Sequence, residues 1–439
     1  MRSSLKRQAD ASPSRPDEHD AKAHEASTNR ARGVRGIFRS LQNPNYRIWA
    51  IGSLISNIGS WMQRTAQDWI VLVGLTNHSA TAVGIVMGLQ FGPQLLLLPI
   101  TGYAADHLDR RKLLFCTQAA MGVLALVLGL LVVTGLVQLW HVYVFAFLLG
   151  CAAAFDSPVR QTFVAELVDD ELLPNAVGLN STSFNAARMI GPAIAGALIA
   201  AVGTGWVFLI NAASFIAVLI SLTVLRTVRL REPPPRERGS LLEGFRYVLR
   251  RDDLKAVLVM LFLIGTFGLN FPVFISTMSV RVFHAGAGAF GLLTSMMAAG
   301  SVIGALMVAA RGRPTIRVLL TGALFFGIGC TVAAVMPDYA SFGIVLMLVG
   351  IAAQTVTTST NSYVQTSTEH HMRGRVTAIL LAIALGGTPI GAPIVGWIAD
   401  AFGPRWALGV GAASGLSAAL VAFIYLTARN GKRADAGTP

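Results

Sequence analysis

The sequence predicts an all-α membrane protein in which twelve membrane-spanning helices form two duplicated six-helix bundles. Hydrophobic residues make up 54% of the 439 residues and charged residues only 13%, whereas about 25% of the residues in a soluble domain are charged. The apolar residues come in runs of roughly 20, the length that crosses a bilayer as a helix. A stretch that begins at Ile190 is repeated from Ile390.

The apolar runs follow one another along the whole chain. The first six lie at about 47–74, 80–104, 113–134, 138–157, 174–201 and 205–226. The second six lie at about 254–281, 286–310, 315–336, 339–364, 376–400 and 404–427. Backbone groups inside a bilayer have no water to bond, so each run is predicted to be a helix. The predicted domains are a disordered polar tail (1–35), a six-helix bundle (36–226), a linker with an amphipathic helix (227–253), a second bundle (254–428) and a tail (429–439).

The repeated stretches align without a gap over 25 residues. The matched residues are Ile190/Ile390, Gly191/Gly391, Ile194/Ile394, Gly196/Gly396, Gly203/Gly403, Trp206/Trp406 and Ala212–Ser214 with Ala412–Ser414. Many secondary transporters are built from duplicated halves, with the substrate site between them. The duplication therefore favours transport.

The positive charge is distributed by loop. Of the 35 Lys and Arg residues, ten precede residue 48 and nine lie between Arg226 and Lys255. With alternating helices, almost all loop cations fall on one side, and the other side holds only Arg281 and Arg405. The positive-inside rule then places both termini in the cytoplasm of a multi-pass protein of the cytoplasmic membrane. The net charge of +13 is therefore interpreted as a signal that orients the protein in the membrane. No nucleic-acid partner is expected.

Motifs for several chemistries are missing from the sequence. It contains no Walker A, HExxH or GxSxG pattern, which argues against a nucleotide-driven pump, a metalloprotease and a serine hydrolase. Cys116, Cys151 and Cys330 fall inside apolar runs, where small buried hydrophobic residues are expected. His107 and the His370–His371 pair lie in loops and are read as solvated. No catalytic residue, cofactor or metal site is predicted.

Only three charged residues lie well inside a predicted span: Arg64, Asp68 and Arg188. Each costs about 2.5–3.5 kcal/mol on insertion scales, so each is expected to face protein or a water-filled cavity. Asp68 is the only deep carboxylate and is the predicted proton carrier, with Arg64 and Arg188 as its partners. A carboxylate that is alternately paired and exposed changes its proton affinity. The alternative is a permanent Arg64–Asp68 pair, four residues apart, that only stabilises the first span.

Small polar residues form stripes on the predicted spans and are expected to line a central cavity. These residues are Asn57, Ser60, Asn185, Asn270, Gln354, Thr358 and Asn361. The alternative is that they are ordinary hydrogen-bonding contacts between helices. Two arginines with one acid leave the cavity positive, which favours anionic or catechol-like cargo.

A family resemblance follows from the loop after the second span. Gly102-Tyr-Ala-Ala-Asp106-His-Leu-Asp-Arg110-Arg111 is similar to the G-x-x-x-D-x-x-x-R-[RK] signature of the major facilitator superfamily. The segments NPNYRIWAIGSLISNIGSWMQ and DSPVRQTFVAEL resemble the branch that contains the enterobactin exporter and actinobacterial drug-efflux proteins. The resemblance implies a proton-linked exporter with alternating access, across roughly residues 40–428.

The resemblance also implies roles for particular residues. Gly102, Asp106, Arg110 and Arg111, with Asp156 and Arg160, are expected to form a cytoplasmic gate; plain positive-inside anchoring is the alternative. Gly178, Gly191, Pro192 and Gly196 resemble the antiporter signature of the family, with Ala187 and Ala195 in place of two glycines. The corresponding loop of the second half, Arg311-Gly312-Arg313, lacks the Gly and Asp of the signature. The gate is therefore expected to be asymmetric.

The function predicted from the sequence is export of small amphiphilic molecules, a siderophore or a drug-like metabolite, by proton antiport. A monomer in the lipid bilayer is expected. An importer or uniporter of the same architecture, and a membrane sensor or scaffold that transports nothing, are the alternatives.

Overall fold

The structure, a computed structural model, describes residues 38–225, 241–310 and 314–435. The predicted tail 1–35, the linker up to residue 240, and Arg311 and Arg313 lie outside the described residues. Within these ranges the regular structure is entirely helical, and ten helices are long and apolar enough to cross a membrane. The predicted all-α membrane fold is confirmed.

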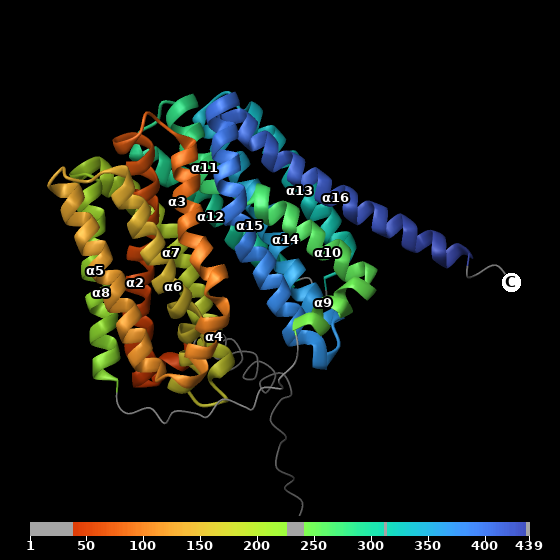
Figure 1. Ribbon diagram of the computed structural model, residues 1–439, viewed down its shortest axis with the longest axis horizontal. Helices are drawn as coiled ribbons and strands as arrows, with labels where there is room; N and C mark the ends of the chain where they lie inside the picture. Colours follow the sequence, from red (N-terminus) through yellow and green to blue (C-terminus); the bar gives the residue numbers. More distant parts are fainter. Residues whose placement is uncertain (1–37, 226–240, 311–313, 436–439) are drawn as a thin grey trace, which may run out of the picture.

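The first half of the protein holds the first six predicted spans (Figure 1). Its elements are η1 (Arg39–Gln42), α2 (Pro44–Trp69) with its π-helical continuation η2 (Ile70–Leu75), α3 (Ala80–Leu96), α4 (Leu98–His107), α5 (Arg110–Val133), α6 (Leu139–Leu167), α7 (Leu173–Val202) and α8 (Thr204–Val224). The Asn43 side chain caps α2 by accepting hydrogen bonds from the N–H groups of Asn45 and Tyr46. The second predicted span is divided at Leu97, because Pro99 has no N–H to continue the helix.

The second half repeats this plan. Its elements are α9 (Leu241–Arg250), α10 (Asp252–Leu263), η3 (Ile264–Gly268), α11 (Phe271–Thr277), η4 (Met278–Val282), α12 (Ala287–Ala310), α13 (Ile316–Val335), α14 (Tyr339–Ser367), η5 (His370–Met372), α15 (Arg373–Phe402) and α16 (Pro404–Asp435). Elements α10 to η4 form one span with two π-helical segments. Helix α16 continues past residue 428, the predicted end of the second bundle, to Asp435.

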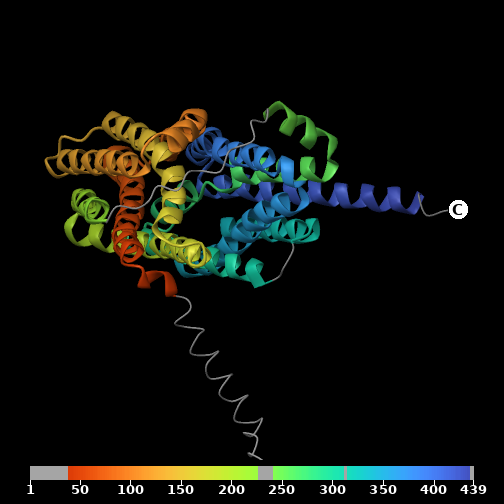
Figure 2. The same cartoon turned by 90° about the horizontal axis from the view of Figure 1, so that it is seen from below.

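The duplicated glycines have the same backbone role in both halves. Gly203 ends α7 with φ +90° and Gly403 ends α15 with φ +102°. Residues with a side chain rarely adopt these values, so only glycine allows the immediate start of the next helix. Seen along the bundle, the two groups of helices lie side by side (Figure 2). The repeat in the sequence is thus a repeat of helix–turn–helix geometry.

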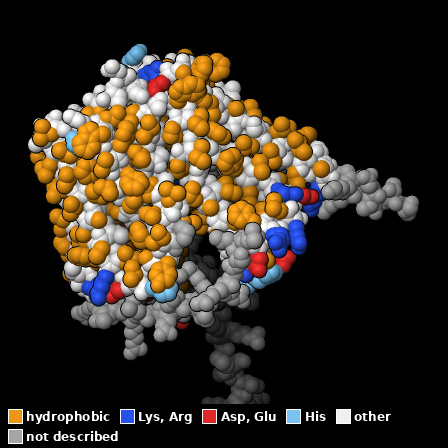
Figure 3. Space-filling model, in the orientation of Figure 1, with side chains coloured by type: hydrophobic (Ala, Val, Ile, Leu, Met, Phe, Trp, Pro, Cys, Tyr) orange, Lys and Arg blue, Asp and Glu red, His pale blue; other side chains and the backbone are white. Residues whose placement is uncertain are grey.

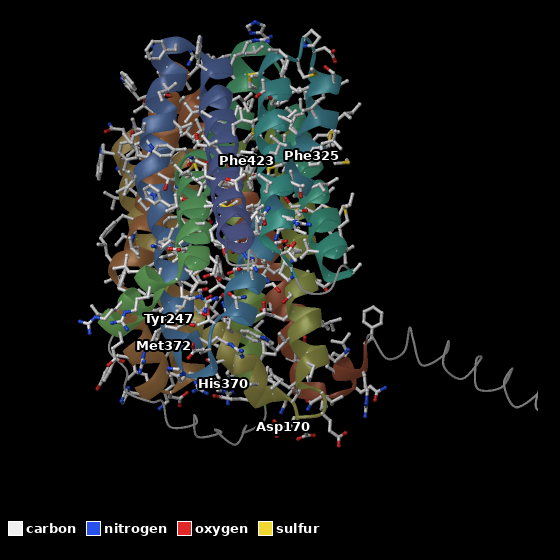
Figure 4. All side chains as sticks on the ribbon, turned by 90° about the vertical axis from the view of Figure 1, so that its right-hand side faces the viewer. Asp170, Tyr247, Phe325, His370, Met372 and Phe423 are labelled. Carbon is white, nitrogen blue, oxygen red and sulfur yellow. The ribbon has the colours of Figure 1, made fainter. Side chains whose placement is uncertain are left out.

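The two ends of the molecule differ in charge. One, called the basic end, holds Arg110, Arg111, Arg250 and Arg373. The opposite end holds the turns at His78, Gly135, Gly203 and Gly403. Between them lies a broad hydrophobic belt (Figure 3), on which Phe325 and Phe423 project outward (Figure 4). Such a belt is the surface that lipid chains cover.

Helix α9 is docked on the second half at the basic end. The Arg375 guanidinium pairs with Glu243 at 2.9 Å, which joins α15 to α9. Arg251 donates to the Asp253 carboxylate at 2.8 and 2.6 Å and to the Tyr247 hydroxyl at 3.1 Å. The hydrogen bonds to Asp253 raise the pKa of Arg251 above its ordinary value. Tyr247 and Met372 lie in the same corner of the molecule (Figure 4).

Glycines allow α12 and α14 to pack closely in the second half. A methyl group added at Gly300 would lie 2.0 Å from the Met347 carbonyl oxygen, and one at Gly350 would lie 2.3 Å from the Met297 carbonyl oxygen. Real side-chain carbons do not approach a backbone oxygen this closely. The crossing is a small-residue contact of the kind that holds membrane helices together.

We expect Gly300→Ala to lower the free energy of unfolding by about 1–3 kcal/mol, because the added methyl forces α12 and α14 apart. Unfolding in detergent with increasing denaturant measures the change. Gly178→Ala is the control, since no atom of another helix lies within 4 Å of a methyl group at that site. Equal stability of the two variants would contradict the close packing of α12 on α14.

Candidate functional site

A cavity of about 220 Å³, called the central cavity below, lies between the two halves. Helices α2, α3 and α7 supply its first-half wall, and α11, α12 and α15 supply its second-half wall. Arg64, Asp68 and Arg188 all line it. The structure therefore brings together the three intramembrane charges, from α2 and α7, at the junction of the halves.

Asp68 is nearly enclosed, with 9% of its surface exposed. Within the described ranges its carboxylate makes no hydrogen bond or ion pair. The Arg64 guanidinium lies instead over two aromatic rings, 5.1 Å from the centre of Trp61 and 5.5 Å from that of Phe91. Cation–π contacts of this kind hold a desolvated guanidinium without neutralising it. The intrahelical Arg64–Asp68 pair is not formed in this conformation.

Arg188, which lines the central cavity, connects the two halves. Its guanidinium on α7 donates to the Ser301 hydroxyl on α12 at 3.1 Å. Nearby, the Trp69 ring stacks on the Phe290 ring with centroids 5.9 Å apart. Both contacts change if the halves move, so the charges of the central cavity respond to the relative position of the two halves.

A second, larger cavity, called the vestibule below, lies in the first half toward the basic end and has a volume of about 510 Å³. Asn57, Arg160 and Asn185 line it, with Asn180 and Ser181 beside them. Its wall comes from α2, α6 and α7, and seven of its ten lining residues are polar. Figure 3 shows a hollow between the halves toward this end. Water and polar solutes can be held here.

Asp156 is the centre of a buried polar cluster between α2, α5 and α6. Its carboxylate pairs with Arg160 at 3.0 Å and accepts hydrogen bonds from Thr117 at 3.0 Å and Gln118 at 2.6 Å. Arg160 also donates to Ser53 at 2.9 Å and to Asn57 at 3.2 Å. Both the Asp156 carboxylate and the Arg160 guanidinium thus have hydrogen-bond partners besides each other, as a buried ion pair requires.

The signature loop makes two separate contacts at the basic end. Arg110 pairs with Glu166 on α6, whose side chain is only 2% exposed. Arg111 donates to the carbonyl oxygens of Leu222 at 2.7 Å and Thr223 at 3.0 Å, and so caps the end of α8. Neither arginine joins the Asp156–Arg160 cluster, because the partners of both lie elsewhere. The Asp106 side chain lies outside what the structure describes.

The halves meet closely toward the opposite end, where α3 crosses α15 and α7 crosses α12. A methyl at Gly396 would lie 2.4 Å from the Ala80 carbonyl oxygen, and one at Gly196 would lie 2.6 Å from the Ala287 carbonyl oxygen. Both crossings therefore have backbone-to-backbone contact. This conformation is closed at the opposite end.

Duplicated helical halves with a site between them are a common plan of secondary transporters. A model of a family described as transmembrane secretion effector matches residues 36–438. The chain belongs to this family, a branch of the major facilitator superfamily. It is a membrane transporter and not an enzyme.

Curated relatives of this transporter cover most of the chain. It is 28% identical to the multidrug efflux pump Tap of Mycolicibacterium fortuitum over 80% of this chain and 88% of the relative. It is 26% identical to the staphyloferrin A transporter of Staphylococcus aureus, with the same two coverages of 80% and 88%. The enterobactin exporter of Shigella boydii is 26% identical over 81% of this chain and 85% of the relative.

Solved structures give the same fold. A bacterial homologue of the iron transporter ferroportin, in an inward-facing state, superimposes with a TM-score of 0.68 at 16% identity, over 87% of this chain and 98% of the other. At this identity the comparison supports the fold of the transporter alone.

Several predicted cavity residues of this transporter lie away from the central cavity. Ser60 lines a small cavity of about 80 Å³ inside the first half. Asn270 is fully buried, and its amide donates to the Thr266 carbonyl at 2.7 Å because π-helical η3 leaves that oxygen free. Three residues of α14 form hydrogen bonds within that helix and line neither the central cavity nor the vestibule: Gln354, Thr358 and Asn361.

The antiporter-like glycines have different surroundings. A methyl at Gly191 would lie 2.7 Å from the Trp61 side chain on α2, and Gly196 packs on α12 as described above. Pro192 lines the central cavity. Gly178 and Gly102 face open space, so close packing does not explain them in this conformation.

Glu166 and Ser301 are functional candidates that the sequence reasoning missed. Glu166 belongs to the DSPVRQTFVAEL segment on which the family resemblance rests. In sequence, however, it cannot be distinguished from any other acidic residue near the end of a helix. Ser301 is one of many small residues on α12. Only their contacts with Arg110 and Arg188 distinguish them.

Proposed function

We propose that this transporter exports small amphiphilic molecules by proton antiport, with Asp68 as the proton carrier and the central cavity as the cargo site. The observation that supports the proposal is an enclosed carboxylate, without a hydrogen bond or ion pair, that lines the same cavity as two arginines at the junction of the halves. Such a group gains a proton when it is unpaired and loses it when a cation or water approaches. Movement of the halves changes that environment.

The cargo class follows from the chemistry of the cavity. Two guanidinium groups attract an anion, while Trp61, Phe91 and Phe290 offer aromatic surfaces. An aromatic or catechol-like anion satisfies both. The names of the relatives, a siderophore exporter and multidrug efflux pumps, support small amphiphilic cargo.

We also propose that the basic end is cytoplasmic, with both termini inside the cell, because the positive-inside rule assigns Lys- and Arg-rich loops to the cytoplasm. The conformation described here then opens inward through the vestibule, and a single chain is the transporting unit. Asp156–Arg160 and Arg110–Glu166 are proposed as the parts of the cytoplasmic gate that rearrange when this end closes.

The test uses inverted membrane vesicles, whose interior corresponds to the outside of the cell. An acidic interior is expected to drive uptake of catecholate siderophores or anionic aromatic dyes, and a protonophore is expected to abolish the uptake. Accumulation only in right-side-out vesicles would make the protein an importer. Equilibration that ignores the protonophore would make it a uniporter, and no movement of any cargo would favour a sensor or scaffold.

A further inference from the structure

Asp400, near the end of α15, makes a contact that no part of the proposed mechanism uses. Its carboxylate accepts hydrogen bonds from the N–H groups of Ala80 and Thr81, both at 2.9 Å. It also accepts from the hydroxyl groups of Ser79 at 3.0 Å and Thr81 at 2.7 Å. These donors form the first turn of α3, where N–H groups have no partner within the helix. A carboxylate of the second half thus caps a helix of the first half.

The carboxylate is held in place by its own half. Arg281 on η4 donates to Asp400 at 3.0 Å and to the Ala399 carbonyl at 3.1 Å. The side chains of Arg281 and Asp400 are 29% and 28% exposed. Charge-assisted bonds that are partly shielded from water are stronger than fully exposed ones. The contact with α3 is therefore the part that breaks if the halves separate.

The duplication provides an internal comparison. Gly396 meets Ala80, the first residue of α3, and Gly196 meets Ala287, the first residue of α12. The two crossings are thus equivalent in the repeat. Residue 400 corresponds to residue 200, which is alanine. Close packing is common to both crossings, whereas the carboxylate cap occurs at only one.

We propose that Asp400, with Ser79 and Thr81, is a latch that holds the opposite end of the transporter closed and sets how readily cargo leaves there. The latch rests on the alternating access of the proposed function. Opening that end separates α15 from α3 and breaks all four hydrogen bonds at once. The equivalent position in the second crossing is Ala200, which cannot cap α12, so the carboxylate cap adds to the cost of opening only between α3 and α15.

The test measures the distance between spin labels at Trp206→Cys and Trp406→Cys in nanodiscs. These are equivalent exposed positions at the opposite end, one in each half; Cys116, Cys151 and Cys330 are replaced by serine beforehand. Asp400→Ala puts the residue found at position 200 into the α15 crossing. The ratio of open to closed molecules is expected to rise by about tenfold or more, given the strength of hydrogen bonds to a charged group.

Two further variants make the result specific. Ser79→Ala/Thr81→Val removes the donors from the other half and is expected to shift the ratio in the same direction, with little further change when combined with Asp400→Ala. Asp338→Asn is the control, because Asp338 caps α14 within its own half by accepting from the N–H groups of Ala340 and Ser341. The control is expected to leave the distances unchanged.

The outcomes separate the latch from the proposed function, since no cargo is needed. If the wild-type distances change between pH 5.5 and pH 8 but Asp400→Ala matches the wild type, the latch is wrong and alternating access stands. Fully additive shifts in the combined variant would also overturn the latch. A single distance in every protein and at both pH values would overturn both the latch and alternating access.

Discussion

Asp68→Asn is expected to exchange cargo across a membrane but to lose accumulation of cargo driven by a pH gradient. The amide keeps the shape of the carboxylate and cannot release a proton, so the halves still move but the movement no longer carries H⁺. Accumulation in proteoliposomes is expected to fall by about tenfold or more, a change of about 1.4 kcal/mol in the driving free energy. Cargo-for-cargo exchange in the same vesicles is expected to remain close to the wild-type rate.

Asp338→Asn is a suitable control for this experiment, because it removes an acid that is far from the central cavity and exposed at the end of the bundle. Full accumulation by Asp68→Asn would remove Asp68 from the coupling mechanism. Loss of exchange as well as accumulation would show instead that Asp68 serves cargo binding or the shape of the cavity.

Arg160→Ala is expected to have the largest effect on stability. It leaves Asp156, which is 6% exposed, without its cation and deprives Ser53 and Asn57 of a hydrogen-bond donor. Removing one partner of a buried ion pair costs about 3–5 kcal/mol. Denaturant unfolding in detergent measures the loss. Adding Asp156→Ala is expected to recover part of the stability, because no unpaired charge then remains.

Lys255→Ala is the matched control, since it breaks the exposed Lys255–Asp252 pair, whose side chains are 43% and 63% exposed. An exposed pair contributes about 0–1 kcal/mol. If Arg160→Ala were no less stable than Lys255→Ala, the buried cluster would not stabilise the first half.

The helices could be predicted from the sequence because the bilayer imposes their length and apolar content. The predicted first span, 47–74, corresponds to α2 with η2, although its polar stripe lowers its hydropathy. The repeat was predicted from the Gly203/Gly403 match among others, and the structure adds that both glycines form turns with positive φ. Local physics is sufficient for these features, since each depends on neighbouring residues.

The contacts proposed for the cytoplasmic gate and for the latch could not be predicted in the same way. Arg110 pairs with Glu166 and Asp400 caps α3, and both acids lie near helix ends, where charged residues are usually solvated. No repeating pattern in the sequence predicts the contact between Asp400 and Thr81, because it depends on how the two halves of the chain dock. Asn270 was predicted to line the cavity but is buried in the core. The π-helical segment η3 just before it changes the helix face on which its side chain lies.

Proton movement driven by a cargo gradient is the most direct measurement of proton antiport. Proteoliposomes with equal pH on both sides carry a pH-sensitive dye inside, and a catecholate siderophore or anionic aromatic dye is added outside. Cargo that enters the vesicles is expected to drive protons out, so the interior becomes alkaline in the wild type, while the pH signal is lost in Asp68→Asn. Cargo entry with no change of internal pH in the wild type would contradict proton antiport.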